Sequence, residues 1–161
     1  MGLPVCFTAR FEANGSWSHE DPIDDSLDDL KSMSKELDEK VERLLRRAAS
    51  RRGLVSYGTF HALFAQSVPL HERYEKLEAA AAALCEPRVA DYASLLATAS
   101  GLPGPDFYQR FRRLHAQRYY ALLGADRNRM LKLVEKRQFA SEERERVYDH
   151  YRSTAEVAVP A

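Results

Sequence analysis

The sequence has few cysteines and no long apolar run. Its two cysteines, Cys6 and Cys85, lie far apart and form no CxxC pair, which excludes a disulfide framework and a cysteine-based zinc site. No stretch approaches the roughly 20 apolar residues that a membrane-spanning helix requires. The apolar start is broken by Pro4 and ended by Arg10, so it is too short for a signal peptide. We therefore expect a cytoplasmic protein, in our interpretation a bacterial one, that has no contact with a membrane.

The sequence also lacks net charge. It has 24 Lys and Arg residues against 24 Asp and Glu residues in 161, and 45% of its residues are hydrophobic. A chain of this length buries roughly 68–70% of its unfolded surface, which is enough for a core without disulfide or metal support. Zero net charge argues against a protein that holds nucleic acid by overall charge alone.

Signatures of catalysis and metal binding are missing. No glycine-rich phosphate loop and no nucleophile elbow occurs, and no two histidines have the spacing of a metal site. The acidic residues Asp24, Asp38 and Glu39 would suit a metal-dependent nuclease, but they fit better on the solvated face of a helix. We therefore expect no enzyme, no catalytic residue, no metal and no cofactor.

The most regular element is a helix over residues 25–52. Leu30, Leu37 and Leu44 recur every seven residues, and Val41 and Ala48 occupy the companion heptad position. Acidic residues fill the first turn and arginines the last, which is the arrangement that the helix dipole favours. Gly53 is expected to end this helix.

The rest of the chain is mostly helical by its pattern. Ser56 is a good N-cap for a short helix that carries Phe60, Leu63 and Phe64, and Ser141 is expected to cap the last helix. Residues 89–98 fit a strand and a helix equally well. Further helices are predicted over residues 70–85, 106–123, 126–137 and 141–154.

These patterns predict a mainly α fold with few short strands. Residues 1–24 are expected to form a short strand at 3–11 followed by a loop, and residues 155–161 a tail. Residues 25–154 are expected to be one domain, in which the long N-terminal helix leads into a centre at about 41–114 and a helical extension at 115–154.

The centre contains a spaced pattern of glycines, tyrosines and leucines. Gly53 and Tyr57 form a G-x-x-x-Y element, Tyr92 to Leu96 follow with two leucines, and Gly101 to Tyr108 read G-L-P-G-P-D-F-Y. On these residues the stretch from Val41 to about Leu114 resembles a small prokaryotic domain with a winged-helix-like layout. The resemblance implies that fold and a link to DNA, but no activity. Asp106 stands where the family usually has glycine, so the closing turn is expected to differ.

Charge is distributed unevenly along the chain. Residues 12–29 contain seven acidic residues and no basic one, whereas residues 110–152 contain twelve basic and six acidic residues with interleaved tyrosines. Such rings can stack on bases or pack under arginine. The acidic and basic parts could equally cover each other. The predicted nucleic-acid-binding residues are Arg110, Arg112, Arg113, Arg118, Arg127, Arg129 and Lys132.

Two functional hypotheses follow. The first is a non-enzymatic protein that contacts nucleic acid, or a complex that handles it, through the basic C-terminal surface. The helix over 70–85 would then occupy the recognition position, although its basic residues are balanced by glutamates. The alternative is a helical adaptor subunit of a bacterial defence or mobile-element system without nucleic-acid contact, with Leu30, Leu37 and Leu44 packing in a dimer or against a partner helix.

Overall fold

The structure is a computed structural model that describes the backbone of residues 24–157 and the side chains of residues 31–157. Over this range the fold is mainly α, as the sequence predicts. The strand expected at residues 3–11 lies outside the described residues. The elements are α1 (Asp24–Ser50), β1 (Val55–Ser56), α2 (Tyr57–His61), α3 (Leu70–Leu84), the 3-10 helix η1 (Tyr92–Leu95), β2 (Leu96–Ala97), α4 (Pro105–Leu114), α5 (Ala116–Leu123) and α6 (Leu133–Val157).

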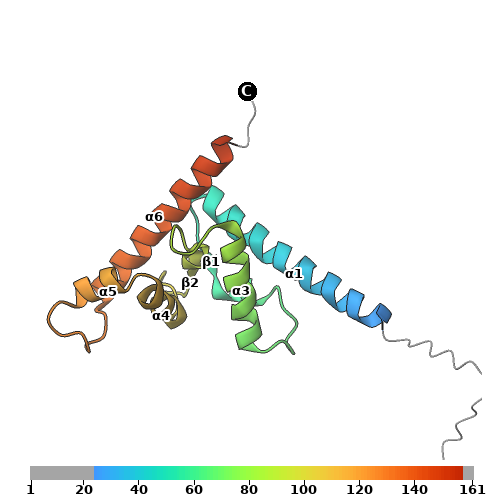
Figure 1. The fold of residues 1–161 in the computed structure, drawn as a ribbon, viewed down its shortest axis with the longest axis horizontal. Helices are drawn as coiled ribbons and strands as arrows, with labels where there is room; N and C mark the ends of the chain where they lie inside the picture. Colours follow the sequence, from blue (N-terminus) through green and yellow to red (C-terminus); the bar gives the residue numbers. More distant parts are fainter. Residues whose placement is uncertain (1–23, 158–161) are drawn as a thin grey trace, which may run out of the picture.

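The two long helices, α1 and α6, form the arms of an inverted V, and the other elements lie in the angle between them (Figure 1). The C-terminal end of α1 meets α6, where the hydroxyl of Tyr148 donates a hydrogen bond of 3.2 Å to the carbonyl of Gly53. The N-terminal end of α1 projects away from the other helices. No helix of the described part is long and apolar enough to cross a bilayer.

Two hydrophobic clusters fill the angle between α1 and α6. The first contains Val41 and Leu45 of α1 with side chains from α2, α3 and η1. The second contains Phe107 and Phe111 of α4 with side chains from α5 and the following loop. Helix α6 contributes to both clusters, with Val147 in the first and Phe139 in the second. It therefore joins the centre of the chain to the C-terminal extension.

The heptad leucines of α1 pack against the chain itself. Leu37 and Leu44 are partly buried against the first cluster, beside the fully buried Val41 and Leu45. The side chain of Leu30 lies outside the described side chains. Two of the three leucines that were predicted to face a partner therefore contribute to the fold of one chain.

The end of α1 is a Schellman motif. The N–H of Gly53 donates to the carbonyl of Ala48 at 2.9 Å, and the N–H of Arg52 donates to that of Ala49 at 3.1 Å. Helix α1 ends at Ser50, two residues before the predicted end, and the left-handed residue is Arg52, with φ of 49°. Gly53 is the next position, where its N–H closes the motif.

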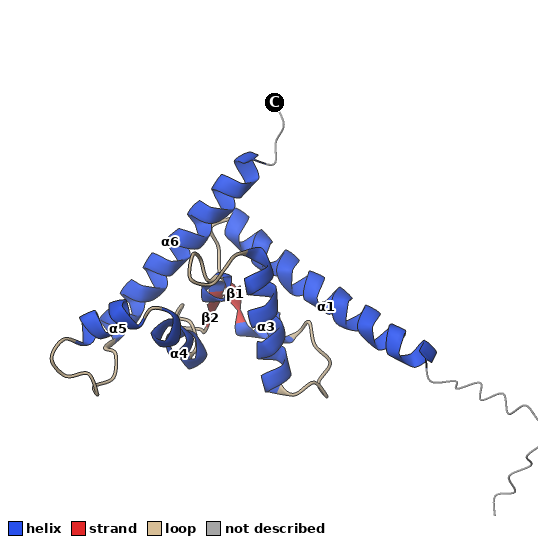
Figure 2. Cartoon of the chain, viewed as in Figure 1, coloured by secondary structure: helices blue, strands red, loops and turns tan. Residues whose placement is uncertain are grey.

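Residues 89–98, whose sequence fits a strand and a helix equally well, contain a short piece of each. Residues 92–95 form η1, capped by the Asp91 side chain, and residues 96–97 form β2. This strand pairs in parallel with β1, with Val55 opposite Leu96 (Figure 2). Residues 90–97 are all buried. The guanidinium of Arg144 donates 2.9 Å hydrogen bonds to the carbonyls of Ser94 and Gly101, so α6 pairs backbone groups that the short sheet leaves free.

The C-terminal helices differ from the predicted ones. The helix expected at 106–123 breaks at His115 into α4 and α5, and the helices expected at 126–137 and 141–154 are a loop followed by the single helix α6. Ser141 is therefore not an N-cap; it is exposed on the solvent side of α6. The reason is tertiary packing, because Phe139, Ala140 and Val147 are buried on one continuous face and that burial outweighs local capping preference. Residues 155–157, expected in the tail, continue α6.

Candidate nucleic-acid interface

Helix α4 begins at Pro105, within the G-L-P-G-P-D-F-Y segment. Pro105 occupies its first turn after the N-cap Gly104, and Asp106 and Arg113 lie at the ends where the dipole favours their charges. One face of the helix is buried, with the rings of Phe107 and Phe111 in the second cluster. The last turn, with Arg112 and Arg113, stays exposed.

Helix α5 places two tyrosines beside the end of α4. The ring of Tyr119 stacks on Phe139 of α6 with an interplanar angle of 7° and a centroid distance of 6.3 Å. The hydroxyl of Tyr120 accepts a 2.9 Å hydrogen bond from Nε of Arg112. The guanidinium of Arg127 lies 5.8 Å from the centroid of the same Tyr120 ring. Tyr120 therefore orients two arginines that come from different elements.

The loop between α5 and α6, residues 124–132, is tied down by Arg129. Its guanidinium donates to the carbonyls of Leu122 and Leu123 at the end of α5, and to both carboxylate oxygens of Glu135 at 2.8 and 2.6 Å. The hydrogen bonds from Arg129 and from the N–H of Lys132 lower the pKa of Glu135 to about 2. Arg129 therefore caps α5 and closes the loop, and its charge is neutralised locally.

A pocket of about 340 Å³ opens between α4, α5 and this loop. Tyr108, Leu123 and Leu131, all nearly buried, form its apolar interior. Among the residues described around it none is acidic, and its basic lining residues are Arg112, Arg127, Arg129 and Lys136. The ammonium of Lys136 lies 5.5 Å from the centroid of the Tyr108 ring. The pocket thus combines aromatic surface with a cationic rim.

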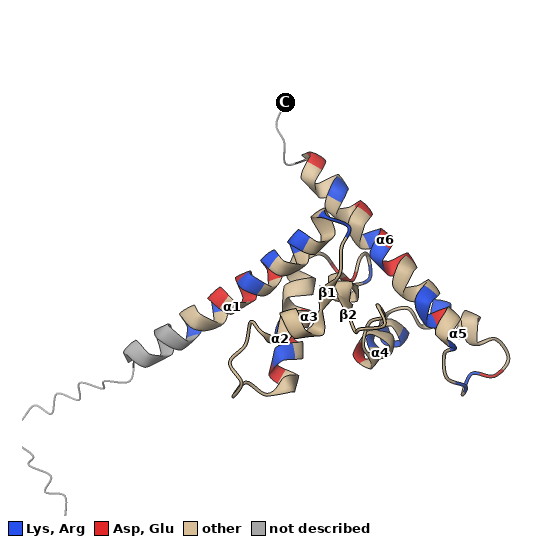
Figure 3. Cartoon of the chain, turned by 180° about the vertical axis from the view of Figure 1, so that it is seen from behind, with Lys and Arg blue, Asp and Glu red and all other residues tan. Residues whose placement is uncertain are grey.

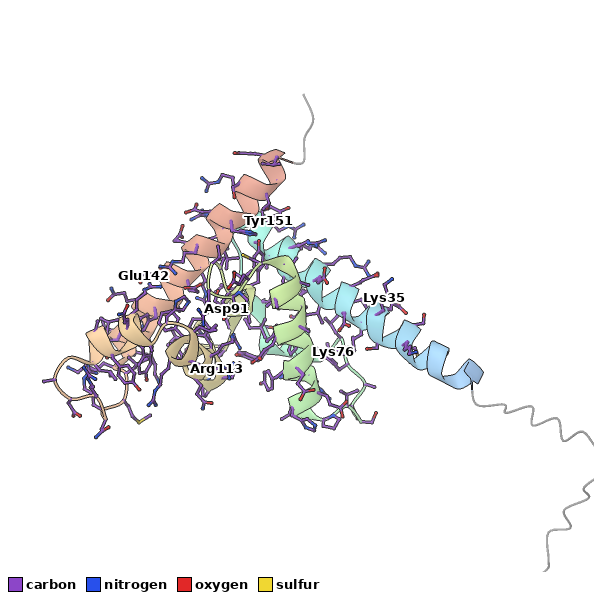
Figure 4. The ribbon with its side chains drawn as sticks, viewed as in Figure 1. Lys35, Lys76, Asp91, Arg113, Glu142 and Tyr151 are labelled. Carbon is purple, nitrogen blue, oxygen red and sulfur yellow. The ribbon has the colours of Figure 1, made fainter. Side chains whose placement is uncertain are left out.

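The predicted basic residues divide into two groups. Arg112, Arg113, Arg127 and Lys132 are exposed on α4 and the loop. Figure 4 labels Arg113 on α4 and Asp91 in the interior between the long helices. Of the four exposed residues, Arg112 and Arg127 line the same pocket, and Arg113 and Lys132 are not among its lining residues.

The second group is used inside the fold. Arg110 is only 5% exposed and pairs with Asp91 at 2.7 Å and Glu78 at 3.2 Å. Arg118 pairs with Glu142 at 2.7 Å, and Arg129 pairs with Glu135. The guanidinium of Arg110 is therefore not on the surface that a ligand would meet.

The basic excess of the C-terminal part is not a continuous charged face. Lys and Arg alternate with Asp and Glu along α1 and α6 (Figure 3). Within the C-terminal part some basic residues are paired with acidic ones, as in the pairs of Arg118 with Glu142 and Arg129 with Glu135. The side chains of the acidic segment 12–29 lie outside the described residues, so its cover of the basic part stays a prediction. Arg112, Arg127 and Lys136, which line the pocket, form no ion pair with a described acidic residue, and the same holds for Arg47 and Arg51 at the end of α1.

The basic side chains Arg73 and Lys76 of α3 are not available to contact a nucleic acid. Arg73 folds back onto the carbonyls of Ala65 and Val68, and Lys76 reaches Asp38 of α1 at 2.9 Å. The glutamates Glu72, Glu75 and Glu78 are exposed. Because its cations are used internally, α3 presents an acidic surface where a recognition helix would need a basic one.

Sequence reasoning missed part of the pocket. Lys136 is not among the predicted binding residues, although it lies one helical turn after Lys132 in the sequence. Gln109, Asn128 and Met130 line the pocket as well, and no local pattern marks them. No group of metal ligands was found within the described part of the chain.

Comparisons of the chain with protein-family models, with curated proteins and with solved structures found no match.

Proposed function

We propose that this protein is a non-enzymatic binding protein that contacts nucleic acid through α4, α5 and the 124–132 loop. The observation that carries the proposal is the pocket, where Arg112, Arg127 and Lys136 lie over or beside tyrosine rings and the described lining has no acidic residue. Nucleic-acid affinity rests on cations that meet phosphates and on rings that meet bases. Arg113 is exposed on α4 beside Arg112 in the sequence, and Lys132 is exposed at the end of the 124–132 loop.

The acidic surface of α3 supports contact away from the recognition position of a winged helix. A winged-helix-like centre remains part of the proposal, supported by the succession of helix, strand, two α-helices, a 3-10 helix and strand from α1 to β2. A cytoplasmic, bacterial setting belongs to the proposal as well and rests on the sequence. A dimer is also proposed from the sequence, but Leu37 and Leu44 pack within the chain, so these heptad leucines do not support it.

A mobility-shift titration tests the proposal. We expect single-stranded or duplex oligonucleotides to bind at low salt and to dissociate as salt rises. The double substitution Arg112→Glu and Arg113→Glu should abolish the shift. The matched control reverses two exposed arginines of α1, Arg43→Glu and Arg47→Glu, on the opposite arm of the molecule, and should retain it.

One observation favours the alternative of a protein-interaction subunit. Met130, Leu133 and Val134 are 82%, 53% and 72% exposed at the start of α6, and a group of exposed apolar side chains is typical of a protein contact. This alternative predicts no nucleic-acid shift at any salt concentration. It also predicts self-association in sedimentation experiments, reduced by Met130→Glu and Val134→Glu.

A further inference from the structure

We propose that the pocket between α4, α5 and the 124–132 loop takes one unstacked base of a single-stranded nucleic acid. This inference rests on the proposed function and specifies its ligand. The volume of about 340 Å³ lies in the range of sites that enclose small organic groups. A base brought into it would leave its sugar and phosphates at the rim.

The interior suits a flat ring. Tyr108, Leu123 and Leu131 supply apolar surface, and Tyr119 supplies a half-buried ring along the wall. Tyr119 is held in place by its stacking on Phe139 and by its edge contact with Tyr120, and the guanidinium of Arg112 lies 5.9 Å from its ring centroid. A ring that is fixed before the ligand arrives loses little conformational entropy on binding, so Tyr119 is the expected stacking partner.

The rim suits the polar parts of a nucleotide. Arg112 and Arg127 are oriented by Tyr120, and Lys136 lies over Tyr108. These cations can meet phosphates on either side of an inserted base. The amides of Gln109 and Asn128, both exposed among the lining residues, can donate to and accept from the edge of a base.

Other anions fit this combination less well. A free phosphate or an acidic peptide uses the cations but leaves the aromatic interior unfilled. A base within a duplex is paired and stacked on both faces, so it cannot enter without leaving the helix. The exposed glutamates of α3 also disfavour a second contact across a duplex groove. An unpaired base of a single strand can contact the aromatic interior while its phosphates contact the cationic rim.

Fluorescence anisotropy with matched oligonucleotides tests this inference on the full chain. The probes are a single strand of about 12 nucleotides, a size typical of single-strand-binding sites, the same strand with abasic sites, and its duplex. We expect the intact single strand to bind about 5- to 150-fold more tightly than the abasic strand, the range that one aromatic stack provides. The duplex should bind more weakly than the single strand at the same salt concentration.

Variants of Tyr119 provide the specific control. Tyr119→Leu keeps an apolar contact with Phe139 but removes the ring, and should erase the preference for the intact strand. Tyr119→Phe keeps the ring and should retain the preference. Equal binding of intact and abasic strands by the unmodified protein, or an unchanged preference in a folded Tyr119→Leu variant, would overturn the inference.

A competition assay needs no variant. Adenosine monophosphate should displace the labelled strand at a lower concentration than ribose 5-phosphate, which lacks the base, or inorganic phosphate. Equal displacement by all three would contradict base recognition while leaving phosphate binding intact. Absence of any oligonucleotide binding at low salt would instead refute the proposed function itself, so the two failures are distinguishable.

Discussion

The backbone N–H of Gly104 donates a hydrogen bond of 2.8 Å to the phenolic oxygen of Tyr57. The contact joins two parts of the sequence pattern of the centre, the tyrosine of G-x-x-x-Y and the second glycine of G-L-P-G. A Cβ at position 104 would lie 2.6 Å from the Tyr57 hydroxyl oxygen, closer than packed atoms approach. Glycine is needed here for close approach, and its contact places the start of α4 against α2.

Gly104→Ala should therefore destabilise the protein by about 1–3 kcal/mol, the range for overpacking a close contact. Tyr57→Phe removes the acceptor and leaves the amide of Gly104 unpaired, with an expected loss of about 1–3 kcal/mol. Urea unfolding of both single variants and of the double variant measures these effects. Losses that simply add in the double variant would contradict a direct contact.

Arg52 offers a test of backbone strain at the end of α1. Both Arg52→Gly and Arg52→Ala lose the ion pair with Glu145 and the contact with the Tyr148 ring. Only glycine adopts the left-handed conformation of this position without penalty. We expect the glycine variant to be more stable than the alanine variant by about 1 kcal/mol in thermal unfolding. Equal stabilities would contradict the positive φ of Arg52.

Arg110 should affect stability far more than its neighbours. Removing its guanidinium in Arg110→Ala leaves the buried carboxylate of Asp91 without its partner, a change expected to destabilise by about 3–5 kcal/mol. The matched control is the exposed Arg113→Ala on the same helix, which should stay within about 0.5 kcal/mol. Similar small effects of both substitutions in denaturant unfolding would mean that Arg110 is not buried in an ion pair.

The 124–132 loop should respond to acid through Glu135. Because its pKa is lowered from 4.5 to about 2 by Arg129 and the N–H of Lys132, this carboxylate stabilises the fold fully above pH 4.5. The stabilisation is lost as the pH falls through about 2. An NMR titration of the Glu135 carboxyl group measures the shift directly, and a midpoint at its ordinary value would contradict the closed loop.

Trypsin provides a complementary assay of the same loop at neutral pH. Glu135→Gln weakens the bidentate pair and should accelerate cleavage after Arg127, Arg129 or Lys132. Glu142→Gln, which weakens the pair with Arg118 elsewhere on α6, is the control and should leave the cleavage rate in the loop unchanged.

Sequence patterns predicted α1 and the start of α2. Heptad leucines and end charges placed α1, and the hydroxyl of Ser56 does cap α2 by accepting from the N–H of Thr59. The prediction of Ser141 as an N-cap was wrong, because a capping hydrogen bond stabilises less than the burial of Phe139 and Val147 on one continuous helix. The parallel pairing of β1 with β2 involves two residues on each side, too few to leave a periodic signal.

The site could be predicted only in part, because the contacts that build it join residues distant in sequence. Sequence reasoning identified the basic C-terminal part of the chain and its tyrosines, and four of the seven proposed residues are exposed, of which Arg112 and Arg127 line the pocket. It could not separate Arg110 or Arg118 from this group, because their acidic partners Asp91 and Glu142 lie distant in sequence. The pocket itself depends on the break at His115, which turns α5 back beside α4.

The salt dependence of single-strand binding is the sharpest test of the proposed nucleic-acid surface. Affinity measured by anisotropy across a range of salt concentrations gives a slope of log affinity against log salt that reports the number of neutralised phosphates. Neutralising Arg112 and Arg127 to Gln should reduce the magnitude of this slope by about 1.4, or about 0.7 for each phosphate that no longer meets a cation. Neutralising Arg43 and Arg47 on α1 should leave it unchanged. Equal changes in both pairs, or no binding at low salt, would contradict the assignment of this surface to nucleic acid.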